Sequence, residues 1–500
     1  MQLQEIVKDI TNEVESKEQG KDIGNILITG ITDNSKEVKK GHLFVAVSGY
    51  NFEGHGYIEE AISLGAAAII GEKEVGSLQV PYIKVNNSRK VLGLIAKNFY
   101  GDPSTEKIMI GITGTNGKTT ISHMLRHILE NNGVSCSVIG TLHYIINGKK
   151  IKSGNTTPGP LKLNSLLATS NDRVVIMEVS SHGLVQHRIE GIKFDYCIFT
   201  NLYHEHLDFH GTMEEYFQAK SLLFNKLKPN GVAIINGDND WGEKLYENLN
   251  QKKINTYLVG QSQNSDLLVE DYNTSKNPFI SLKEYTESIN IHLPIPGIHN
   301  LYNAALTYPV ARELEVSKKD ILLSFNQFPG VPGRFEVYTE EEGPTIVIDY
   351  AHTADAIFHI LKTARECGAK KIYHIFGFRG GRDKSKRSEM VKVSSELSDV
   401  TILTTDDLNT EGNEMYLSMN KLHMEYYSDE DMIIHDRTLA IQYAFTKGTK
   451  KDWVIITGKG PESYNNKFAL PTNSDKETVL YLQGKKQKRK EAFLNKNIPT

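Results

Sequence analysis

A glycine-rich segment at residues 114–120, with the sequence GTNGKTT, is the part of the chain best suited to binding phosphate. It follows the apolar run IMIGIT and precedes ISHMLRHILE, which has helical spacing. A strand, a glycine-rich loop and a helix in this order let backbone N–H groups and a helix N-terminus hold phosphate groups. We expect Lys118 to meet the β- and γ-phosphates of a nucleotide and the hydroxyl of Thr119 to bind Mg²⁺. The longer phosphate-loop pattern would place glycine at Ile112, so only the shorter form is present.

Acidic and histidine side chains follow two other apolar runs and are candidate metal ligands. Glu178 ends the run RVVIME, and the carboxyl ends of parallel strands line the crevice of an α/β sheet. A glutamate there often caps a helix or forms an ion pair, but the phosphate-binding segment favours a Mg²⁺ ligand. The segment NLYHEHLDFHG brings together His204, His206, Asp208 and His210, a density suited to metal or phosphoryl chemistry. Zinc is the alternative, although no cysteine accompanies the histidines and their spacing is not that of a helical HExxH site.

The elements that must position these residues begin with a small N-terminal unit. At roughly 150 residues per domain, a chain of 500 residues is expected to form about three domains. Residues 1–103 contain short apolar strands and a helical pattern at residues 57–64, which predict a small α/β domain. The first 17 residues, in which charges interrupt the apolar side chains, predict an amphipathic helix.

Residues 104–334 and 335–500 share another pattern. Apolar runs end in polar or glycine-rich loops, among them DYCIFTNL and GVAIING in the first stretch and TIVIDYAH, KIYHIFGF and DWVIITGKG in the second. Such runs, separated by segments whose apolar residues have helical spacing, predict parallel βα units. The cluster FPGVPGR at residues 328–334 predicts a hinge between the two stretches. We therefore expect an α/β protein of three domains, with boundaries near residues 103 and 334.

The composition excludes several classes of protein. The 57 Lys and Arg residues against 61 Asp and Glu residues give a formal charge of -4, which argues against nucleic acid or an anionic membrane as a partner. The longest apolar runs are far shorter than the ~20 residues of a membrane span, and the first residues lack the apolar core of a signal peptide. Three widely spaced cysteines fit neither a CxxC site nor a disulfide framework, so we expect a cytoplasmic location. The basic run at residues 485–490 is typical of a solvated terminus.

Seven motifs occur in the order that is typical of one enzyme family. They are GTNGKTT, EVSSHGLVQHR, NLYHEHLDFHGT with AKSLLF after it, GIHNLYNAAL, GVPGRFE, DYAHT and GKGPE. On these motifs the chain resembles the Mur ligases, over about residues 25–475, and within them the MurE type. Ligases of that type add the third amino acid of the peptidoglycan stem peptide to UDP-N-acetylmuramoyl-L-alanyl-D-glutamate, a step of cell-wall synthesis.

The resemblance implies a fold and a chemistry. The expected domains are an N-terminal α/β domain for the UDP group, a central ATPase domain of P-loop type on a parallel sheet, and a C-terminal Rossmann-like domain for the incoming amino acid. The implied enzyme is an ATP-dependent amide ligase with ATP and Mg²⁺ as cofactors. A substrate carboxylate takes the γ-phosphoryl group to give an acyl phosphate, and an amine then displaces phosphate; Mg²⁺ and cationic side chains neutralise the anionic reactants. We expect a monomer whose partners are small-molecule substrates.

The resemblance also assigns residues position by position. The UDP-substrate group comprises Asp33, Ser35, Tyr50, Asn51, Phe52, Asn155, Thr156, Thr157, Ser180, Gln186 and Arg188. The ATP group comprises Gly114, Thr115, Asn116, Gly117, Lys118, Thr119, Thr120, Asn300, Arg334 and Asp349. The amino-acid group comprises Arg382, Asp406, Asp407, Leu408, Asn409, Gly458 and Glu462. The implied metal ligands are Thr119, Glu178, His206 and Lys220 as a carbamate, and the implied catalytic set is Lys118, Glu178, His206 and Lys220.

Carbamylation of Lys220, which the resemblance implies, is also physically reasonable. An unmodified ammonium would repel Mg²⁺, whereas a carbamate presents anionic oxygens that can hold the metal. The alternative is an ordinary lysine on the helix YFQAKSLLF.

The chain departs from the family pattern where the third amino acid is expected to bind. Members that take meso-diaminopimelate carry DNPR, whose arginine can pair bidentately with the distal carboxylate, but residues 406–409 here are DDLN. Without that guanidinium, and with Asp407 expected to repel a second carboxylate, diaminopimelate is disfavoured and a basic or neutral amino acid such as L-lysine is favoured. Other changed positions are Arg379, Gly381 and Pro461, with Glu205 where aspartate is usual. Arg382 is retained and is expected to bind an α-carboxylate.

Two alternative functions stay open. A specialised Mur-like paralogue would join a different acid and amine, as folylpolyglutamate synthases do, although those enzymes lack the region NSKEVKKGHLFVAVSG that this chain has at residues 34–49. The second alternative is a binding protein without catalysis. The presence of Lys118, Thr119, Glu178 and Lys220 argues against it.

Overall fold

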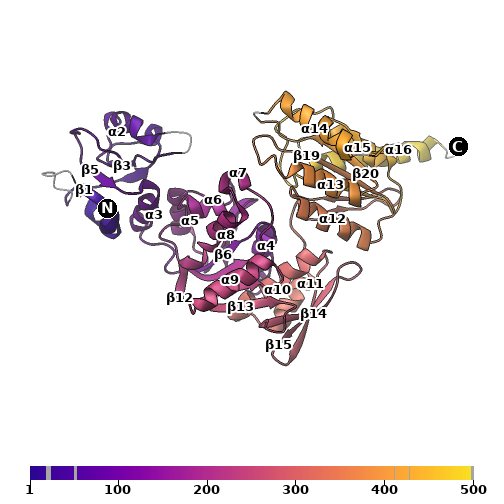
Figure 1. Ribbon diagram of the computed structural model, residues 1–500, viewed down its shortest axis with the longest axis horizontal. Helices are drawn as coiled ribbons and strands as arrows, with labels where there is room; N and C mark the ends of the chain where they lie inside the picture. Colours follow the sequence, from indigo (N-terminus) through magenta and orange to yellow (C-terminus); the bar gives the residue numbers. More distant parts are fainter. Residues whose placement is uncertain (18–23, 50–52, 410, 427, 497–500) are drawn as a thin grey trace.

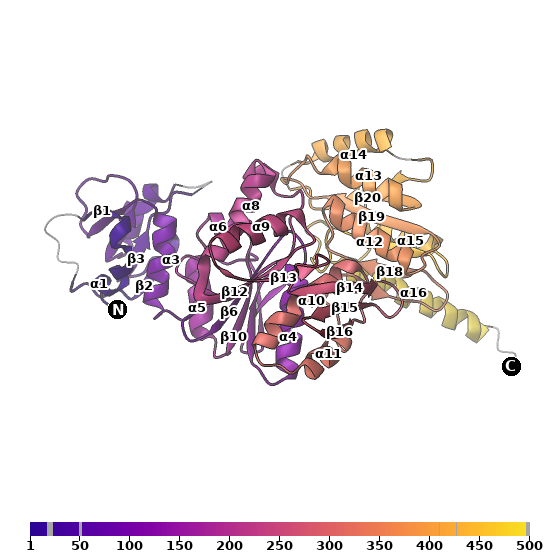
Figure 2. The same ribbon diagram turned by 60° about the horizontal axis from the view of Figure 1, so that its bottom comes forward.

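Three α/β units follow one another along the chain. The computed structural model describes residues 1–17, 24–49, 53–409, 411–426 and 428–496. The strands form sheets of five, eleven and six strands, each from a consecutive stretch of the chain. Figures 1 and 2 show the unit with the eleven-stranded sheet between the other two. The predicted fold class, a three-domain α/β protein, is confirmed. The boundaries near residues 103 and 334 stay a proposal, and both fall between sheets.

The N-terminal unit is a parallel sheet with one antiparallel edge strand. Its order is β1-β5-β4-β3-β2, and only β1 runs antiparallel, against β5. The strands are β1 (Val14–Lys17), β2 (Gly30–Thr32), β3 (His42–Val45), β4 (Ala68–Gly71) and β5 (Tyr82–Val85). The helices are α1 (Leu3–Ile6), α2 (Ile58–Ser63) and α3 (Ser88–Phe99), with 3₁₀ turns at Lys8–Glu13, Ser35–Glu37 and Gly54–Tyr57.

The predicted helix over the first 17 residues is wrong. Only α1 is α-helical, and a 3₁₀ turn leads into β1, where Val14 pairs with Val85. Leu3, Ile6 and Ile10 are still fully buried, so short helical turns place the apolar side chains in the core as a longer helix would. The backbone after Glu13 gains strand hydrogen bonds at the edge of the sheet, which a continuing helix could not make.

The central unit is a mixed sheet whose middle is parallel. The order is β16-β15-β14-β13-β12-β11-β6-β10-β7-β8-β9, with antiparallel pairs at both margins. The strands are β6 (Ile108–Thr113), β7 (Cys136–Ile139), β8 (His143–Ile146), β9 (Lys149–Lys152), β10 (Val174–Glu178), β11 (Phe194–Phe199), β12 (Leu227–Asn236), β13 (Asn255–Gly260), β14 (Leu267–Asn273), β15 (Phe279–Glu284) and β16 (Glu287–His292). The helices are α4 (Lys118–Asn131), α5 (Pro160–Thr169), α6 (Ser181–Val185), α7 (Leu207–His210), α8 (Met213–Ser221), α9 (Asp240–Gln251), α10 (Ile298–Glu313) and α11 (Lys318–Asn326), with a 3₁₀ turn at Phe224–Lys226.

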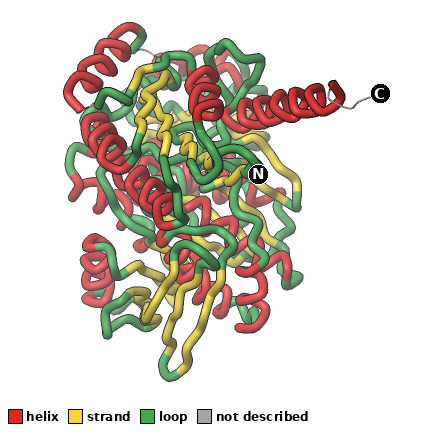
Figure 3. The backbone as a smooth tube through the Cα atoms, turned by 90° about the vertical axis from the view of Figure 1, so that its right-hand side faces the viewer, coloured by secondary structure: helices red, strands yellow, loops and turns green. Residues whose placement is uncertain are grey.

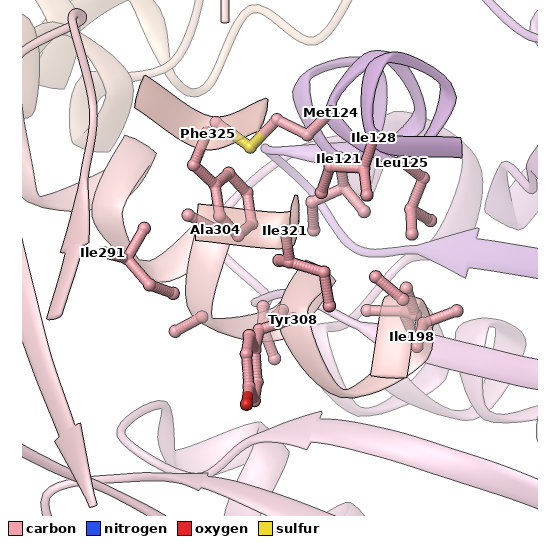
Figure 4. Close-up of a cluster of buried hydrophobic side chains, with 14 of the residues drawn as sticks. Ile121, Met124, Leu125, Ile128, Ile198, Ile291, Ala304, Tyr308, Ile321 and Phe325 are labelled. Atoms are coloured by element: carbon pink, nitrogen blue, oxygen red, sulfur yellow. The ribbon is translucent and has the colours of Figure 1, made fainter. Parts of the chain in front are cut away.

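Helices bury both faces of the central sheet. One core joins α4, α10 and α11 to the sheet, and Figure 4 shows Ile121, Met124, Tyr308, Ile321 and Phe325 from these helices as members of this cluster. The other core uses α5, α8 and α9. Coverage of both faces is the arrangement that the near-continuous apolar strands require. It fixes the strand ends from which the loops of the site emerge.

The C-terminal unit is a doubly wound sheet. The order is β17-β18-β22-β19-β20-β21, parallel except for β17. The strands are β17 (Glu336–Tyr338), β18 (Thr345–Ile348), β19 (Ile372–Phe378), β20 (Val400–Thr405), β21 (Met432–Ile433) and β22 (Trp453–Ile456). The helices are α12 (Ala354–Glu366), α13 (Arg387–Leu397), α14 (Asn413–Tyr426), α15 (Arg437–Lys447) and α16 (Asp475–Lys496). Helices α12 to α14 cover one face and α15 and α16 the other, and Figure 3 shows α16 extending away from the body of the molecule.

The segment at residues 328–334 joins the last two units and packs closely on the C-terminal one. Gly330 and Gly333 both have positive φ, at 81° and 66°. A Cβ on Gly333 would lie 2.3 Å from Cδ of Pro461, so only glycine allows this contact. The three cysteines are free thiols, with Cys136 and Cys197 buried. Within the described parts of the chain, no helix combines the length and the apolar character that crossing a bilayer demands.

Candidate active site

The phosphate-type loop lies between β6, which ends at Thr113, and α4, which begins at Lys118. Its backbone packs too closely for side chains at two positions. A Cβ on Gly114 would lie 1.8 Å from Oγ1 of Thr200, and one on Gly117 would lie 2.5 Å from Oδ1 of Asn303. The loop is thereby held in one shape, with its N–H groups ahead of the helix N-terminus, as anion binding requires.

Lys118 folds back over this loop. Its Nζ donates to the carbonyl oxygens of Gly114 at 2.7 Å and Thr115 at 3.0 Å. Burial lowers the pKa of Lys118, and the carboxylates of Glu178 and Glu205 act in the opposite direction. A cation thus lies at the phosphate loop, where it can meet negative charge.

Glu178 is the centre of a buried hydrogen-bond cluster next to the loop. Only 1% of its surface is exposed. Its Oε2 accepts from the hydroxyls of Thr119 and Thr141, each at 2.8 Å, and its Oε1 accepts from the backbone N–H of Thr141 at 3.1 Å. A Cβ on Gly140 would lie 2.1 Å from Oε1, so a glycine before Thr141 is required. The sequence analysis missed Thr141, and the signal was available, because Gly140 and Thr141 follow a buried strand as GTNGKTT does.

Lys220 and His206 approach the loop from the other side. Lys220 is buried, donates to the carbonyl of Gly114 at 2.9 Å and lies over the ring of Tyr216. Burial, reinforced by Lys118, holds the pKa of Lys220 well below its ordinary range. Burial also lowers the pKa of His206 to about 3, so its imidazole is neutral. Among the described residues, no three His, Cys, Asp or Glu side chains converge on one metal site. Among the four predicted ligands, the hydrogen bond between Thr119 and Glu178 is the one that joins two of them.

The predicted substrate residues of the central unit adjoin Glu178. The hydroxyl of Thr157 donates to the backbone oxygen of Glu178 at 3.0 Å and accepts from the N–H of Ser180 at 2.9 Å. Arg188 donates to the backbone oxygen of Thr157 at 2.8 Å and also to Gln186. Thr156 contacts the hydroxyl of Thr141 at 3.1 Å, and the backbone of Asn155 bonds the hydroxyl of Tyr144.

The predicted uridine residues lie in the N-terminal unit, away from this cluster. Asp33 and Ser35 follow β2, and burial raises the pKa of Asp33. Tyr50, Asn51 and Phe52 lie outside the described residues. The sequence analysis missed Arg89 of α3. Burial lowers the pKa of Arg188, and the charge of Arg89 lowers it further. Arg89 of the N-terminal unit and Arg188 of the central unit therefore interact electrostatically. Two cations near one another are suited to an anionic group between them.

A cavity of about 530 Å³ lies between the central and C-terminal units. Arg334 donates to the hydroxyl of Thr119 at 3.4 Å and lies over the ring of Tyr350. Asp349 accepts from the N–H groups of Phe335 and Ala351, and burial raises its pKa. The predicted residues that line the cavity are Thr115, Asn116, Gly117, Lys118, Thr119, Thr120, Thr156, Glu178, Ser180, His206, Asn300, Arg334, Asp349, Arg382, Asp406 and Gly458. Six other predicted residues of the ATP, metal and amino-acid groups are not among those that line the cavity: Gly114, Lys220, Asp407, Leu408, Asn409 and Glu462.

The C-terminal wall holds a charge arrangement that sequence reasoning did not find. Lys459 is 1% exposed, and its Nζ donates to carboxylate oxygens of Asp406 and Asp407, each at 3.0 Å. The repulsion expected from Asp407 is therefore offset, because its charge is paired with a buried ammonium. Arg379 pairs with Glu462 and lies 3.9 Å from Asp407. The lysine stands in the motif GKGPE just after the buried strand β22, and this position is a signal that could have marked it.

A second unforeseen contact joins the central and C-terminal units. Glu205 is buried, and its Oε1 lies 2.6 Å from Nε2 of His352 and 3.6 Å from Nζ of Lys386. Burial alone would raise the pKa of Glu205, but the charges of His352, His206 and Lys386 hold it well below its ordinary range. Next to it, His204 contacts Ser385 at 3.1 Å.

Comparison with known proteins identifies the family that shares this geometry. The model described as Mur ligase middle domain matches residues 112–311, that of the Mur ligase, glutamate ligase domain matches residues 333–460, and that of the Mur ligase family, catalytic domain matches residues 27–100. The chain belongs to the Mur ligase family. The family predicted from the sequence motifs is confirmed, and this Mur ligase is an ATP-dependent ligase.

Relatives of this Mur ligase cover nearly all of it. The UDP-N-acetylmuramoyl-L-alanyl-D-glutamate–2,6-diaminopimelate ligase of Alkaliphilus oremlandii is 38% identical over 468 residues, which are 92% of this chain and 94% of that one. The ligase of the same name from Aquifex aeolicus is 38% identical over 449 residues, 87% and 89% of the two chains. A solved structure of a ligase with that name superposes with a TM-score of 0.69 at 27% identity, over 97% of this chain and 98% of that one. The MurF ligase of Thermotoga maritima in complex with ADP shares the fold, with a TM-score of 0.63 over 87% and 94% of the two chains.

Proposed function

We propose that this Mur ligase adds the third amino acid to UDP-N-acetylmuramoyl-L-alanyl-D-glutamate in peptidoglycan synthesis. The observation that carries the proposal is the contact between two sets of residues. Thr157, Ser180 and Arg188, the predicted substrate residues, are hydrogen-bonded to one another and to Glu178, which also holds Thr119 of the phosphate loop. A substrate acid and the γ-phosphate of ATP would thus meet at one place. The names of the relatives describe the same substrate.

The residues at this place suit an acyl phosphate mechanism. Lys118, at the loop carbonyls, stabilises charge on the γ-phosphate as the carboxylate attacks, and Arg334, beside Thr119, is a second cation at the same point. The wall of the C-terminal unit then presents the amine of the incoming amino acid to the acyl phosphate. Closure of the two units around the bound substrates would exclude bulk water and protect the acyl phosphate from hydrolysis.

The donor set near the loop fits Mg²⁺. The hydroxyl of Thr119 and the carboxylate of Glu178 are hard oxygen donors held 2.8 Å apart. Lys220 as a carbamate and neutral His206 would complete the set that the family resemblance implies. Burial lowers the pKa of Lys220, which favours the neutral amine, the form that adds carbon dioxide. When bound, the metal would neutralise the charge of the two anionic reactants.

The N-terminal unit would bind the UDP group, with Asp33 and Ser35 near the uridine. Arg89 and Arg188 would hold the diphosphate, because two guanidinium groups close together favour an anion. We retain the predictions of a monomer and of a cytoplasmic enzyme as proposals. The alternative of a paralogue acting on another acid is not favoured, since the names of relatives that cover most of this chain give UDP-N-acetylmuramoyl-L-alanyl-D-glutamate as the acid.

Purified enzyme with UDP-N-acetylmuramoyl-L-alanyl-D-glutamate, ATP, Mg²⁺ and one amino acid at a time tests the proposal. Phosphate release and the mass of the product are measured. With substrate carboxylate labelled by ¹⁸O, one labelled oxygen should appear in the released phosphate, because the acyl phosphate passes it on. Lys118→Ala should lower turnover by about 10²–10³-fold. Absence of phosphate release and of product with every amino acid would contradict the proposed function.

A further inference from the structure

One carboxylate at the cavity differs from the others in having a free oxygen. Among the described residues, Asp383 has the one buried carboxylate oxygen, Oδ2, that accepts no hydrogen bond. A buried polar atom left in that state costs free energy, so it calls for a partner. The other carboxylate side chains that line the cavity each have a hydrogen bond or an ion pair to another residue: Glu178, Glu205, Asp238, Asp349, Asp355 and Asp406.

Asp383 is held from one side only. Its Oδ1 accepts from the backbone N–H of Ser385 at 2.9 Å and from the hydroxyl of the same serine at 2.5 Å. Its side chain is 7% exposed, and Oδ2 lies 3.6 Å from Nε2 of His204, which is too far for a hydrogen bond. Burial alone would raise the pKa of Asp383, but Ser385 and the charges of His204 and Lys386 hold it below its ordinary value. Asp383 is therefore an oriented anion with one oxygen available to a ligand.

Asp383 lies where the two walls of the cavity meet. It belongs to the C-terminal wall, and His204 beside it belongs to the central unit, two residues before His206. Lys386 follows Asp383 and lies 3.6 Å from Glu205 of the central unit. The acyl phosphate would form at the central wall and the amino acid would bind at the C-terminal wall. Their reacting atoms must therefore meet at a junction of this kind.

Arg382, the residue before Asp383, also lines the cavity and is the residue expected to bind the carboxylate of the incoming amino acid. An α-amino acid has its amine and its carboxylate on the same carbon atom. A guanidinium and a carboxylate on consecutive residues match these two groups, because each can bind the group of opposite charge. The free oxygen of Asp383 thus has a ligand group of the right chemistry close to it.

We propose that Oδ2 of Asp383 accepts a hydrogen bond from the amine that becomes the amide nitrogen, while Arg382 binds the carboxylate on the same carbon. The proposal rests on the proposed function and applies to any α-amino acid, whatever its side chain. The contact fixes the direction of the nitrogen relative to the acyl carbon, as a step between two bound reactants requires.

The protons of the amine balance in this arrangement. The amino acid arrives as an ammonium with three hydrogens and loses one of them to water as a proton. The neutral amine then forms the C–N bond, the C–O bond of the acyl phosphate breaks, and a second proton leaves with the phosphate. The third hydrogen stays on the amide nitrogen, and it is the one that Asp383 holds before and after the step.

Hydroxylamine separates this contact from the formation of the acyl phosphate. It is small and uncharged at neutral pH, so it can attack the acyl phosphate without being held by Arg382 and Asp383, and its hydroxamate product gives a coloured iron complex. Asp383→Asn should lower kcat/KM for the amino acid by about 10–100-fold and leave the rate of hydroxamate formation as in wild type. Asp383→Glu, which keeps the charge, should recover part of the loss.

The control is Asp429→Asn, which changes an exposed carboxylate of the same unit and should alter neither rate. Small-angle X-ray scattering of Asp383→Asn should give the wild-type radius of gyration, because the contact is to substrate rather than between units. The inference is overturned if Asp383→Asn forms the amide as wild type does, if hydroxamate formation falls as far as amide formation, or if the radius increases. Absence of hydroxamate with wild-type enzyme would instead contradict the proposed function itself.

Discussion

Three lysines near the cavity, of which Lys220 and Lys459 are buried and Lys118 is partly buried, differ in the charges that surround them. Lys459 lies between two carboxylates, and Glu178 and Glu205 both act on Lys118. Lys220 hydrogen-bonds a backbone carbonyl and faces an aromatic ring, and Glu205 acts on it only from a distance while Lys118 opposes its charge. A buried ammonium without a counterion is costly, and the group responds by losing its proton. Burial and the charge of Lys118 hold the pKa of Lys220 well below its ordinary range, which favours the uncharged amine that its proposed carbamate needs.

Replacement of Lys220 by alanine should abolish most turnover and leave a rescuable enzyme. We expect a loss of at least about 100-fold, as for removal of other groups that stabilise transition-state charge. Acetate or formate should restore part of the rate, because a small carboxylate can take the place of the carbamate oxygens. Lys226→Ala, which removes a nearby lysine paired with Glu190, should show neither effect. Carbon-13 NMR of wild-type enzyme in labelled bicarbonate should show the carbamate; no signal and no rescue by any small acid would leave Lys220 as an ordinary buried lysine.

His374 should make the stability of the C-terminal unit depend on pH. It is fully buried between Ser394 and Thr457, and burial lowers its pKa from 6.5 to about 3. Between these two pH values the unfolded chain binds a proton that the folded unit does not, so the free energy of unfolding falls as the pH falls below 6.5. The slope from this one group approaches about 1.4 kcal/mol per pH unit.

Trp453 in β22 reports on that unit once Trp241→Phe removes the other tryptophan. Denaturant unfolding at pH 7.0 and 5.5 gives the mean slope over this interval, and His374→Gln in the same background should reduce that slope by about 0.8 kcal/mol per pH unit, because the unfolded chain is only partly protonated at pH 7. Equal slopes in the two proteins would mean that His374 titrates alike in the folded and unfolded states.

Residue types and order were enough to predict part of the site. The motifs identified Lys118, Thr119 and Glu178, because each stands in a short local pattern whose chemistry is general. They could not predict that Thr141 holds Glu178 or that Lys459 neutralises Asp407, since the partners are separated by 37 and 52 residues. Such contacts depend on which strands are neighbours, and a single sequence does not contain that information.

At the scale of elements, the parallel strands were predictable and the margins of the sheets were not. Strands such as β6 and β10 are apolar throughout because helices cover both faces, and a continuous apolar run marks them. The edge strand β9 has the sequence KKIK and is exposed at every position, so it lacks that mark. The N-terminal strand β1 was mistaken for a helix for the same reason: an edge strand with charged residues has no clear period.

The hinge at residues 328–334 allows a matched pair of substitutions. Gly330 and Gly333 both have positive φ, but a Cβ on Gly330 meets only Cγ2 of Ile295 at 3.5 Å, whereas one on Gly333 meets Pro461 at 2.3 Å. Gly330→Ala should cost about 1–2 kcal/mol for the left-handed conformation alone. Gly333→Ala should cost several kcal/mol more, because Pro461 and Gly460 must also move. Thermal unfolding measures the difference, and equal melting temperatures would show that the hinge does not pack as closely as described.

At the scale of the whole molecule, the cavity exists only while the central and C-terminal units lie together. The phosphate loop is on one wall, and Arg379, Arg382 and Gly458 are on the other. Among the described residues, polar contacts that join these units include those of His204 to Asp383, Ser385 and Glu389. Glu205, whose side chain is 6% exposed, adds contacts to His352 and Lys386. One carboxylate is thus placed where it can favour the closed arrangement over an open one.

Glu205→Gln should shift that balance toward separated units without unfolding either. A hydrogen bond to a charged group contributes about 1.5–3 kcal/mol, so its loss changes the ratio of closed to open molecules by about 10–100-fold. Small-angle X-ray scattering should give a larger radius of gyration for the variant, and the KM for the amino acid should rise more than the affinity for ADP falls, because only the amino acid needs the second wall. Glu287→Gln removes an exposed partner of Lys318 inside the central unit and should change neither quantity. A variant at Glu205 with wild-type scattering and wild-type KM would assign closure to the segment at residues 328–334 and to Arg334 rather than to this contact.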